Sequence, residues 1–297
     1  MKIITLTMSP AIDVEFHLTG EVNPVGLNRA AGQAISAGGK GINVSRSIAK
    51  QANNDNCNYK EMLVTVAPIG GVNGELLKNI LDGEDLPLTG IKIEENTRLN
   101  ASVIPPQGKP EEINAPGTPI GGALAELEEK ILSMIEQGDT VVIAGSCPKD
   151  VAKSYPAYLV SEIKKRGGYV VLDCDGEALK IAVTGSADGR PDLIKPNTDE
   201  LAELTGMPTD TESEVMAAAE SLGGITVITT MAGDGSVLTK DGESRFFPTE
   251  KRRVVRLKGA GDTFLGAFVY WYRYKSLTPA EAMAKANSAA GAYVAGE

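Results

Sequence analysis

The sequence predicts an α/β protein with a mainly parallel sheet and a separate, smaller β-layer. From residue 121 onward, short apolar runs typical of strands alternate with amphipathic helical stretches, which is the pattern of a parallel sheet with helices on both faces. In the first third of the chain, four short strand-like runs interrupt this alternation, and we expect them to form the separate layer: 14–18, 29–36, 91–93 and 101–104. A length of 297 residues suits one large domain, or one domain with a small appendage.

The elements of the main layer follow in a regular order. The expected strands are β-rich apolar runs, and they cover 2–7, 62–69, 140–144, 169–172, 192–195 and 225–230, followed by a hairpin over 236–247. The expected helices have an amphipathic pattern, and they cover 41–51, 73–81, 121–137, 151–166, 177–183, 201–205 and 212–222, with a last one that begins in the turn 259–264. Residues 105–119 are rich in proline, glycine and polar residues, so we expect a loop or the edge of a hairpin there.

Several polar residues and turns come directly after expected strands. They are Asp13, Gly145, Asp173, Asn197, Thr230 and the turn at Gly259. In open parallel sheets, ligands bind beyond the carboxyl ends of the strands. We therefore expect these residues to converge on one rim and to form one site.

Composition excludes several classes of function. The formal net charge is −10, which argues against binding to nucleic acid or to an anionic membrane surface. No signal peptide opens the chain, and no apolar run approaches membrane-spanning length. The three cysteines are an odd number without a CxxC spacing, as in a reduced, cytoplasmic protein. A single histidine, His17, argues against a histidine-rich metal site and against a Ser-His-Asp triad.

The turn Gly259-Ala260-Gly261-Asp262 opens a helix near the C-terminal end of the sequence. Its two glycines allow a tight turn with inward-pointing N–H groups, and the positive end of the helix dipole adds to them. Such a turn is an anion-binding site. Asp262 has two interpretations: a carboxylate that complements the helix dipole, or a catalytic carboxylate beside a bound phosphate.

Asn197 and Glu200 follow the expected strand 192–195. Asparagine as the N-cap with glutamate at the third helical position is a capping box. The same pair also suits a hydrated Mg²⁺ ion, which uses few carboxylates near substrate phosphates. Lys195 is either a surface lysine or a phosphate contact, and the segment 233–235 is by default a β-turn.

Three cations lie far from the C-terminal turn in sequence. Lys40 belongs to a glycine loop, Gly38-Gly39-Lys40-Gly41, which is not a Walker loop because glycine, not serine or threonine, follows the lysine. Arg98 and Arg29 lie on or beside the inserted strands, either as exposed strand residues or, if the β-layer folds over the rim, as ligands of a second anion.

A set of short motifs occurs in a fixed order along the chain. They are MSPAID (8–13), AGGKGINVSR (37–46), TRLN (97–100), INAPGTP (113–119), AGSCP (144–148), LDCDGEAL (172–179), DLIKPNTDEL (192–201), MAGDGS (231–236) and GAGDTFLGAF (259–268). Together they resemble the phosphofructokinase B (ribokinase-like) sugar kinases, most of all the branch with 1-phosphofructokinase and tagatose-6-phosphate kinase. The resemblance covers nearly the whole chain. It implies a single three-layer α/β/α domain over residues 1–297, with a β-lid formed by segments near 12–18, 29–37 and 90–115.

The resemblance also implies a role for each matching position. Asp262 matches the base that takes the proton of the acceptor hydroxyl, and Gly259, Ala260 and Gly261 match the anion hole. Phosphoryl transfer needs mainly positioning and charge stabilisation, so these groups suffice for the chemistry. The implied sugar-side residues are Asp13, Gly38, Gly39 and Asn43, with Lys40, Arg98 and Arg29 on the phosphate that the sugar already carries. The implied ATP-side residues are Lys195, Asn197, Thr230, Gly233, Gly235 and Asn287, and Asn197 with Glu200 is tied to Mg²⁺, through water.

The chain departs from the family pattern at three places. Ser9 replaces an asparagine beside the sugar, and Cys147 replaces a leucine in what reads as a small packing change. Arg256-Leu257-Lys258 replaces the usual segment before the glycine turn, which in relatives helps to shape the nucleotide site and a monovalent-cation site. Two alternatives stay open for Lys258: it stands in for such a cation, or it disturbs nucleotide binding.

These observations lead to one expected activity and its alternatives. We expect an ATP- and Mg²⁺-dependent kinase of a ketohexose monophosphate, first fructose 1-phosphate, then tagatose 6-phosphate, then fructose 6-phosphate. The non-enzyme alternative is a silent sugar-phosphate-binding relative. A nicotinamide-dependent dehydrogenase is excluded because no GxGxxG follows the first strand. The family resemblance also implies a homodimer through the β-lid, and an exposed β-layer whose edges need to be covered supports this expectation.

Overall fold

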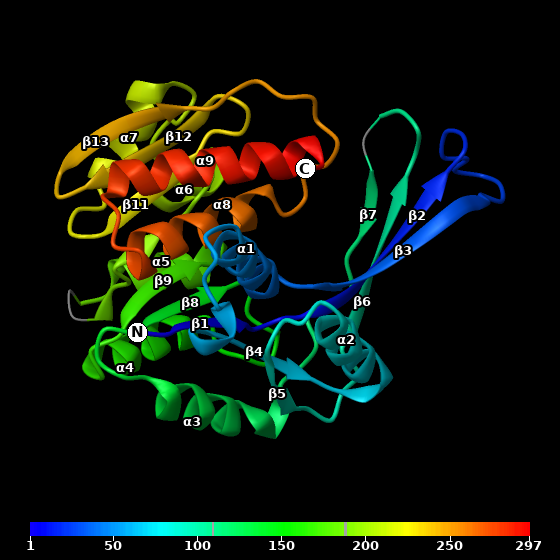
Figure 1. The fold of residues 1–297 in the computed structure, drawn as a ribbon, viewed down its shortest axis with the longest axis horizontal. Helices are drawn as coiled ribbons and strands as arrows, with labels where there is room; N and C mark the ends of the chain where they lie inside the picture. Colours follow the sequence, from blue (N-terminus) through cyan, green and yellow to red (C-terminus); the bar gives the residue numbers. More distant parts are fainter. Residues whose placement is uncertain (109, 187–188) are drawn as a thin grey trace.

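The computed structural model describes residues 1–108, 110–186 and 189–297, which form two β-sheets (Figure 1). Over these residues the larger sheet has nine strands, in the order β13-β12-β11-β10-β9-β8-β1-β4-β5. Their bounds are β1 Ile3–Thr7, β4 Leu63–Ile69, β5 Leu88–Lys92, β8 Thr140–Ala144, β9 Tyr169–Asp173, β10 Leu193–Ile194, β11 Thr226–Thr230, β12 Gly235–Lys240 and β13 Glu243–Pro248. The neighbouring strands β11, β10, β9, β8, β1, β4 and β5 pair in parallel. β12 pairs antiparallel with β11 and with β13.

Helices cover both faces of this sheet. β1 lies between β4 and β8 and is fully buried, and its successive side chains point to opposite faces: Ile4 and Leu6 enter one core, and Ile3 the other. The first core is closed by α3 Leu124–Met134, α4 Tyr155–Lys165, α5 Gly176–Thr184, α6 Thr198–Thr205 and α7 Glu212–Glu220. The second is closed by α1 Lys40–Asn54, α2 Gly71–Gly83, α8 Ala260–Val269 and α9 Pro279–Ala295. The expected three-layer α/β/α arrangement is confirmed.

Short helical segments connect these elements. They include the 3₁₀ turns Tyr59–Glu61 and Gly121–Ala123 and a π-helical turn, Tyr270–Tyr274, between α8 and α9. The helix expected over 151–166 begins later than predicted, because α4 starts at Tyr155. Pro156 explains the difference, because proline is tolerated in the first turn of a helix but not in its interior. No helix in the part of the chain that the structure describes has the length and hydropathy needed to cross a membrane.

The smaller sheet projects away from the helices that flank it (Figure 1). Its strand order is β3-β2-β6-β7, with β2 Ala11–Leu18, β3 Ala30–Gly38, β6 Arg98–Ile104 and β7 Glu111–Ile113. β2 directly follows β1, and β3 leads directly into α1. The base of the small sheet is therefore joined to the carboxyl end of β1, where the rim of the large sheet begins.

The membership of the small sheet differs from the prediction. Residues 91–93 were expected there, but β5 pairs in parallel with β4 at the edge of the large sheet. The unit β4-α2-β5 is one more strand–helix–strand crossover. Ile91 is buried in the first core of the large sheet. The fourth strand of the small sheet is instead β7, which lies in the stretch 105–119 that was expected to be a loop or a hairpin edge.

Candidate active site

The turn at Gly259 begins α8 and presents backbone donors. Gly259 has φ +88°, a value that favours glycine, and a Cβ there would lie 2.7 Å from the hydroxyl oxygen of Tyr293. Among the described residues, the N–H groups of Gly261 and Asp262 have no backbone acceptor, whereas that of Ala260 is already bonded. With the positive end of the helix dipole, the two free N–H groups are suited to bind an anion.

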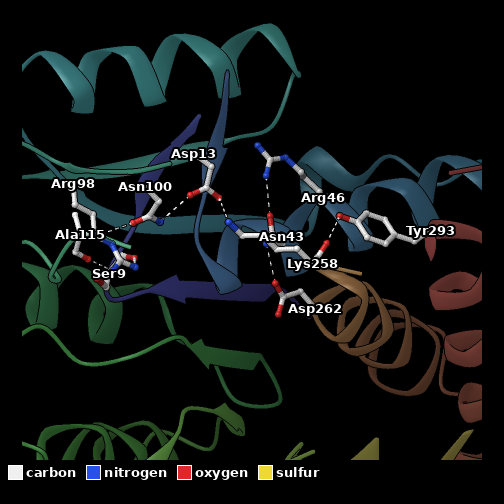
Figure 2. Close-up of polar contacts among 10 residues, drawn as sticks. All are labelled: Ser9, Asp13, Asn43, Arg46, Arg98, Asn100, Ala115, Lys258, Asp262 and Tyr293. Atoms are coloured by element: carbon white, nitrogen blue, oxygen red, sulfur yellow. Dashed lines mark hydrogen bonds and ion pairs between the residues drawn. The ribbon is translucent and has the colours of Figure 1, made fainter. Parts of the chain in front are cut away.

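Asp262 lies in the first turn of α8 and is 8% exposed. Asn43, on α1, donates Nδ2–H to Asp262 Oδ2 at 2.8 Å. Arg46 donates to Asn43 Oδ1 at 2.9 Å, which fixes the orientation of the Asn43 amide (Figure 2). The carboxylate therefore has a defined position beside the anion turn.

Asp173, at the end of β9, holds two lysines at the rim. It is 1% exposed, and its Oδ1 lies 3.6 Å from Lys195 Nζ and 3.7 Å from Lys40 Nζ. Lys195 Nζ also lies 3.5 Å from the position that a Cβ of Gly261 would occupy. One ammonium group is thus beside the anion turn. The place of Asp173 after an expected strand indicated the rim, but no motif indicated that two lysines share this carboxylate.

These charges change the affinity of the site for protons. Burial, followed by the charge of Asp173, raises the pKa of Asp262, while the hydrogen bond from Asn43 and the charges of Lys195 and Lys40 act in the opposite direction. Burial lowers the pKa of Lys40, but Asp173 and further carboxylates outweigh it, so the net pKa is raised. Lys40 stays charged, and Asp262 becomes a stronger base than an exposed aspartate.

Asn197 and Glu200 form the predicted capping box at the start of α6. Asn197 Oδ1 accepts from the N–H of Glu200 at 2.8 Å, and Glu200 Oε2 accepts from the N–H of Asn197 at 2.9 Å. The described residues contain no group of three or more His, Cys, Asp or Glu placed to hold a metal ion. Among the described residues, however, Asp173 Oδ2 is buried and has no hydrogen-bond partner. One free carboxylate oxygen suits a hydrated Mg²⁺ ion that takes its other ligands from water and phosphate.

The residues expected on the nucleotide side lie around β11, β12 and α9. Thr230 forms an isolated parallel bridge with Asn197, so the ends of β10 and β11 are held together. Gly233 lies in the exposed turn that follows. Gly235 has φ +138°, and a Cβ there would collide with the carbonyl of Phe247, so this position requires glycine.

Asn287 connects α9 to the hairpin. Its Oδ1 accepts from Ser236 Oγ at 3.2 Å, and its Nδ2–H donates to the carbonyl of Phe247 at 3.2 Å. A cavity of about 340 Å³ opens beside it, lined also by Phe247 and Arg252. This cavity lies between the end of β13 and α9, beside the residues expected on the nucleotide side.

On the sugar side, Asp13 lies at the base of the small sheet. Asn100, its neighbour across β2 and β6, donates Nδ2–H to Asp13 Oδ1 at 2.8 Å. Lys258 Nζ lies 3.4 Å from the other oxygen, Oδ2 (Figure 2). Gly38 lies against the same carboxylate, because a Cβ there would be 2.5 Å from Oδ2.

The glycine loop before α1 passes close to the end of β1. Gly39 has φ +132°, and a Cβ there would lie 2.5 Å from Cγ2 of Thr7. The backbone can therefore take this path only with glycine at 39. The loop delivers Lys40 to Asp173 and Asn43 to Asp262, so it joins the two halves of the site.

Arg98 is held by the protein itself. Its two terminal nitrogens donate to the carbonyls of Ala115 and Ser9, each at 3.0 Å (Figure 2). Burial lowers the pKa of Arg98, and the charge of Asp13 acts in the opposite direction. Of the five N–H donors of a guanidinium, three remain for a ligand.

Arg29 does not join the other cations within this chain. It directly precedes Ala30, which pairs with Leu18, whereas Asp13 pairs with Ser36. At about 3.3 Å per residue, Arg29 lies roughly 20 Å from Asp13. The expectation that Arg29 converges with Lys40 and Arg98 is wrong for a single chain, because the β2–β3 hairpin extends away from the rim.

Unpaired buried polar atoms gather at this end of the sheet. Among the described residues, Thr7 Oγ1, Ser9 Oγ, Arg98 Nε and Asp173 Oδ2 are buried without a hydrogen-bond partner. Buried polar atoms are normally paired, so a ligand with several polar groups would complete the set.

A cavity of about 870 Å³ between α1 and α9 reaches the edge of the site at Asn43, Lys258 and Gly259, although Asp262 does not line it.

Comparison with known proteins identifies the family and the fold of the chain. The model of the pfkB family of carbohydrate kinases matches residues 6–296. The chain belongs to this family. It therefore has the ribokinase-like fold, and it is a sugar kinase of the phosphofructokinase type, a phosphotransferase with an alcohol acceptor.

Relatives of this pfkB kinase include two named phosphofructokinases. It is 30% identical over 270 residues to 1-phosphofructokinase of Bacillus subtilis (strain 168), covering 90% of this chain and 84% of the relative. It is also 30% identical over 276 residues to ATP-dependent 6-phosphofructokinase isozyme 2 of Escherichia coli (strain K12), with the same coverage. The structure of E. coli phosphofructokinase-2 with fructose 6-phosphate superposes with a TM-score of 0.88 at 27% identity, over 99% of this chain and 93% of that one. Family membership implies the use of ATP.

Proposed function

We propose that this pfkB kinase transfers the γ-phosphoryl group of ATP to a ketohexose monophosphate, with fructose 1-phosphate as the first-choice acceptor and fructose 1,6-bisphosphate as the product. One observation carries the proposal: Asp262 is held by Asn43 between the anion turn and the Asp13 side of the rim. A base and a phosphoryl-binding turn thus face a polar acceptor site. Tagatose 6-phosphate and fructose 6-phosphate are the alternatives, and the two 30%-identical relatives differ in the acceptor that their names give.

The chain's own residues account for the steps of this reaction. Asp262 accepts the proton of the attacking hydroxyl, and its raised pKa makes it a better base. The N–H groups of Gly261 and Asp262 and the ammonium of Lys195 stabilise negative charge on the phosphoryl group. A Mg²⁺ ion bound with ATP, near Asp173 and Glu200 through water, would neutralise phosphate charge.

On the sugar side, Asp13 and Asn100 bind the hydroxyl groups in this proposal. Lys40 and the remaining donors of Arg98 bind the phosphate that the acceptor already carries. Several cations would be unnecessary for a neutral sugar, and they support a phosphorylated one. ATP and sugar phosphates meet in the cytoplasm, where we place the enzyme.

We also propose a homodimer formed through the small sheet. Ile35, Leu99 and Ile113 are 45%, 44% and 67% exposed, and the strand registers put them on one face of the sheet. An exposed apolar face on a small sheet is typical of an interface. For E. coli phosphofructokinase-2, a tetrameric inhibited form is known. Sedimentation velocity at micromolar concentration should give a dimer, and a monomer would refute the proposal.

The decisive experiment measures ADP release with Mg-ATP and each of the three sugar phosphates, for the wild type and for Asp262→Asn. Activity with fructose 1-phosphate that greatly exceeds the other two, and that is lost in the variant, is the expected result. A preference for tagatose 6-phosphate or fructose 6-phosphate would replace the acceptor but keep the mechanism. The absence of turnover with any of the three would overturn the proposal.

A further inference from the structure

Lys258 points to the sugar side of the site. It stands directly before the anion turn, in the segment that departs from the family pattern, and its Nζ lies 3.4 Å from Asp13 Oδ2 (Figure 2). The two alternatives raised by the sequence both placed this lysine on the nucleotide side. The structure instead directs its charge to the residue that we propose to bind the acceptor.

The backbone beneath Lys258 is firmly held by the last turn of α9. Tyr293 donates its hydroxyl hydrogen to the carbonyl of Lys258 at 2.7 Å. Arg256 donates Nε–H to the carbonyl of Tyr293 at 3.0 Å, and its guanidinium lies 4.1 Å from the centre of the Tyr293 ring. The N–H groups of Val255 and Arg256 share the carbonyl of Val294. The root of the lysine is therefore fixed next to Gly259.

The ammonium group of Lys258, in contrast, has unused donors. Its distance of 3.4 Å to Asp13 exceeds the roughly 2.7–2.9 Å of a charge-assisted hydrogen bond. Within the described ranges, Nζ makes no hydrogen bond, and the side chain is 45% exposed. A lysine carries three N–H donors. An oxygen-rich anion between the anion turn and Asp13 would find them directed toward it.

Two lysines therefore flank the anion turn. Lys195 reaches it beside Gly261, and Lys258 precedes Gly259 and turns toward Asp13. We propose that Lys258 binds the phosphoryl group in transfer from the acceptor side, opposite Lys195. This inference rests on the proposed function. The P–O bond to ADP breaks, the P–O bond to the sugar forms, the hydroxyl proton goes to Asp262, and Lys258 keeps its own proton.

Steady-state kinetics of Lys258→Met, Lys258→Arg and Lys251→Met test the proposal. Lys251 is an exposed lysine of the same segment, and its variant should match the wild type. Loss of one charged hydrogen bond to the transferred group should lower kcat of Lys258→Met by about 10- to 100-fold, while KM for ATP stays within about twofold because uniform nucleotide binding is unchanged. Lys258→Arg should recover part of the loss, because it restores the charge.

A binding experiment separates this role from a structural one. ADP with aluminium fluoride and the active sugar phosphate imitates the transferring phosphoryl group, and Lys258→Met should bind this combination at least about tenfold more weakly. Its affinity for ADP alone and its melting temperature should match those of the wild type.

Three outcomes would overturn the inference. The first is an unchanged kcat in Lys258→Met. The second is a lower KM for the sugar at constant kcat, which would mean that the ion pair of Lys258 with Asp13 hinders binding of the sugar. The third is an equal loss of ADP affinity, which would place Lys258 in the nucleotide site. A wild type without turnover refutes the proposed function itself and the inference with it, whereas an active wild type with an unaffected Lys258→Met refutes the inference alone.

Discussion

Asn43 donates its side-chain N–H to Asp262 at 2.8 Å and so connects the start of α1 to the start of α8. Arg46 holds the other end of the same amide. Because Asn43 lies in the first turn of α1, directly after the glycine loop that borders Asp13, the bond fixes Asp262 relative to the Asp13 side of the rim. In the proposed reaction, this single amide would fix the position of the base that accepts the proton.

Replacing Asn43 by alanine should move the acid limb of the pH profile of kcat to higher pH. The Asn43 hydrogen bond lowers the pKa of Asp262, so its loss raises that pKa, and the base is protonated at a pH where the wild type is still active. A pH–rate profile of Asn43→Ala checks this, with the exposed Asn53→Ala on α1 as the control. A limb that stays in place would contradict the prediction.

Asp173→Asn should move the acid limb of the pH profile of kcat to lower pH. The negative charge of Asp173 raises the pKa of Asp262, so its removal lowers it. Lys195 and Lys40 also lose their shared partner, and we expect KM for ATP to rise by about 10-fold or more, since a buried charge pair is broken. The profile and KM are measured together, and a shift to higher pH would refute the assigned charge effect.

Asp262→Asn should lose activity but not stability. Loss of the general base should lower kcat by about 10²- to 10⁴-fold. Since burial raises the folded-state pKa of Asp262, the ionised carboxylate destabilises the fold at pH values above that pKa, and this penalty disappears on acidification. The melting temperature of the variant at pH 7 should equal or exceed that of the wild type, with the difference fading toward pH 4. A lower melting temperature at pH 7 would show that the charge stabilises the fold.

Gly38→Ala should weaken the binding of the sugar alone. The new Cβ would lie 2.5 Å from Asp13 Oδ2, so the carboxylate must move, and we expect KM for the sugar phosphate to rise by about 10-fold with KM for ATP unchanged. Gly32→Ala is a matched control on the same strand, because a Cβ there has no atom within 4 Å. If both variants raised KM for the sugar phosphate equally, the cause would be a change in strand β3 and not the displacement of Asp13.

The sequence contained enough to predict the layers and the rim. Alternating strands and helices determine a parallel sheet, and residues after its strands must share one edge, which brought Asp262, Asp173 and Asp13 into the same region. Strand membership was harder to predict, because β5 and β7 are both short and their pairing depends on long-range contacts. Ile91 belongs to the large sheet because it pairs with Pro68 of β4, and its side chain is buried in the first core.

Contacts between distant side chains lay beyond sequence reasoning. The ion pair of Lys258 with Asp13 depends on how the small sheet meets the anion turn, and no local pattern encodes that distance. Arg29 shows the reverse: its charge suggested a phosphate ligand, but the length of the hairpin carries it away from the rim. Residue type predicted what a group can do, and only the packing determined where it does so.

The shared carboxylate of Asp173 has a thermodynamic consequence. Lys40 belongs to the glycine loop that borders Asp13, and Lys195 lies beside the anion turn, yet both ammonium groups pair with Oδ1 of Asp173. An anion that binds one of the two ammonium groups weakens the ion pair of that group with Asp173. Asp173 then pairs mainly with the other lysine, and the affinity of that lysine for a second anion changes. Under the proposed function, Lys195 binds the transferred phosphoryl group and Lys40 the sugar phosphate, so binding of ATP would change the affinity for the sugar phosphate. Linkage makes this effect reciprocal and equal in both directions. One buried carboxylate oxygen would then couple the binding of the two substrates.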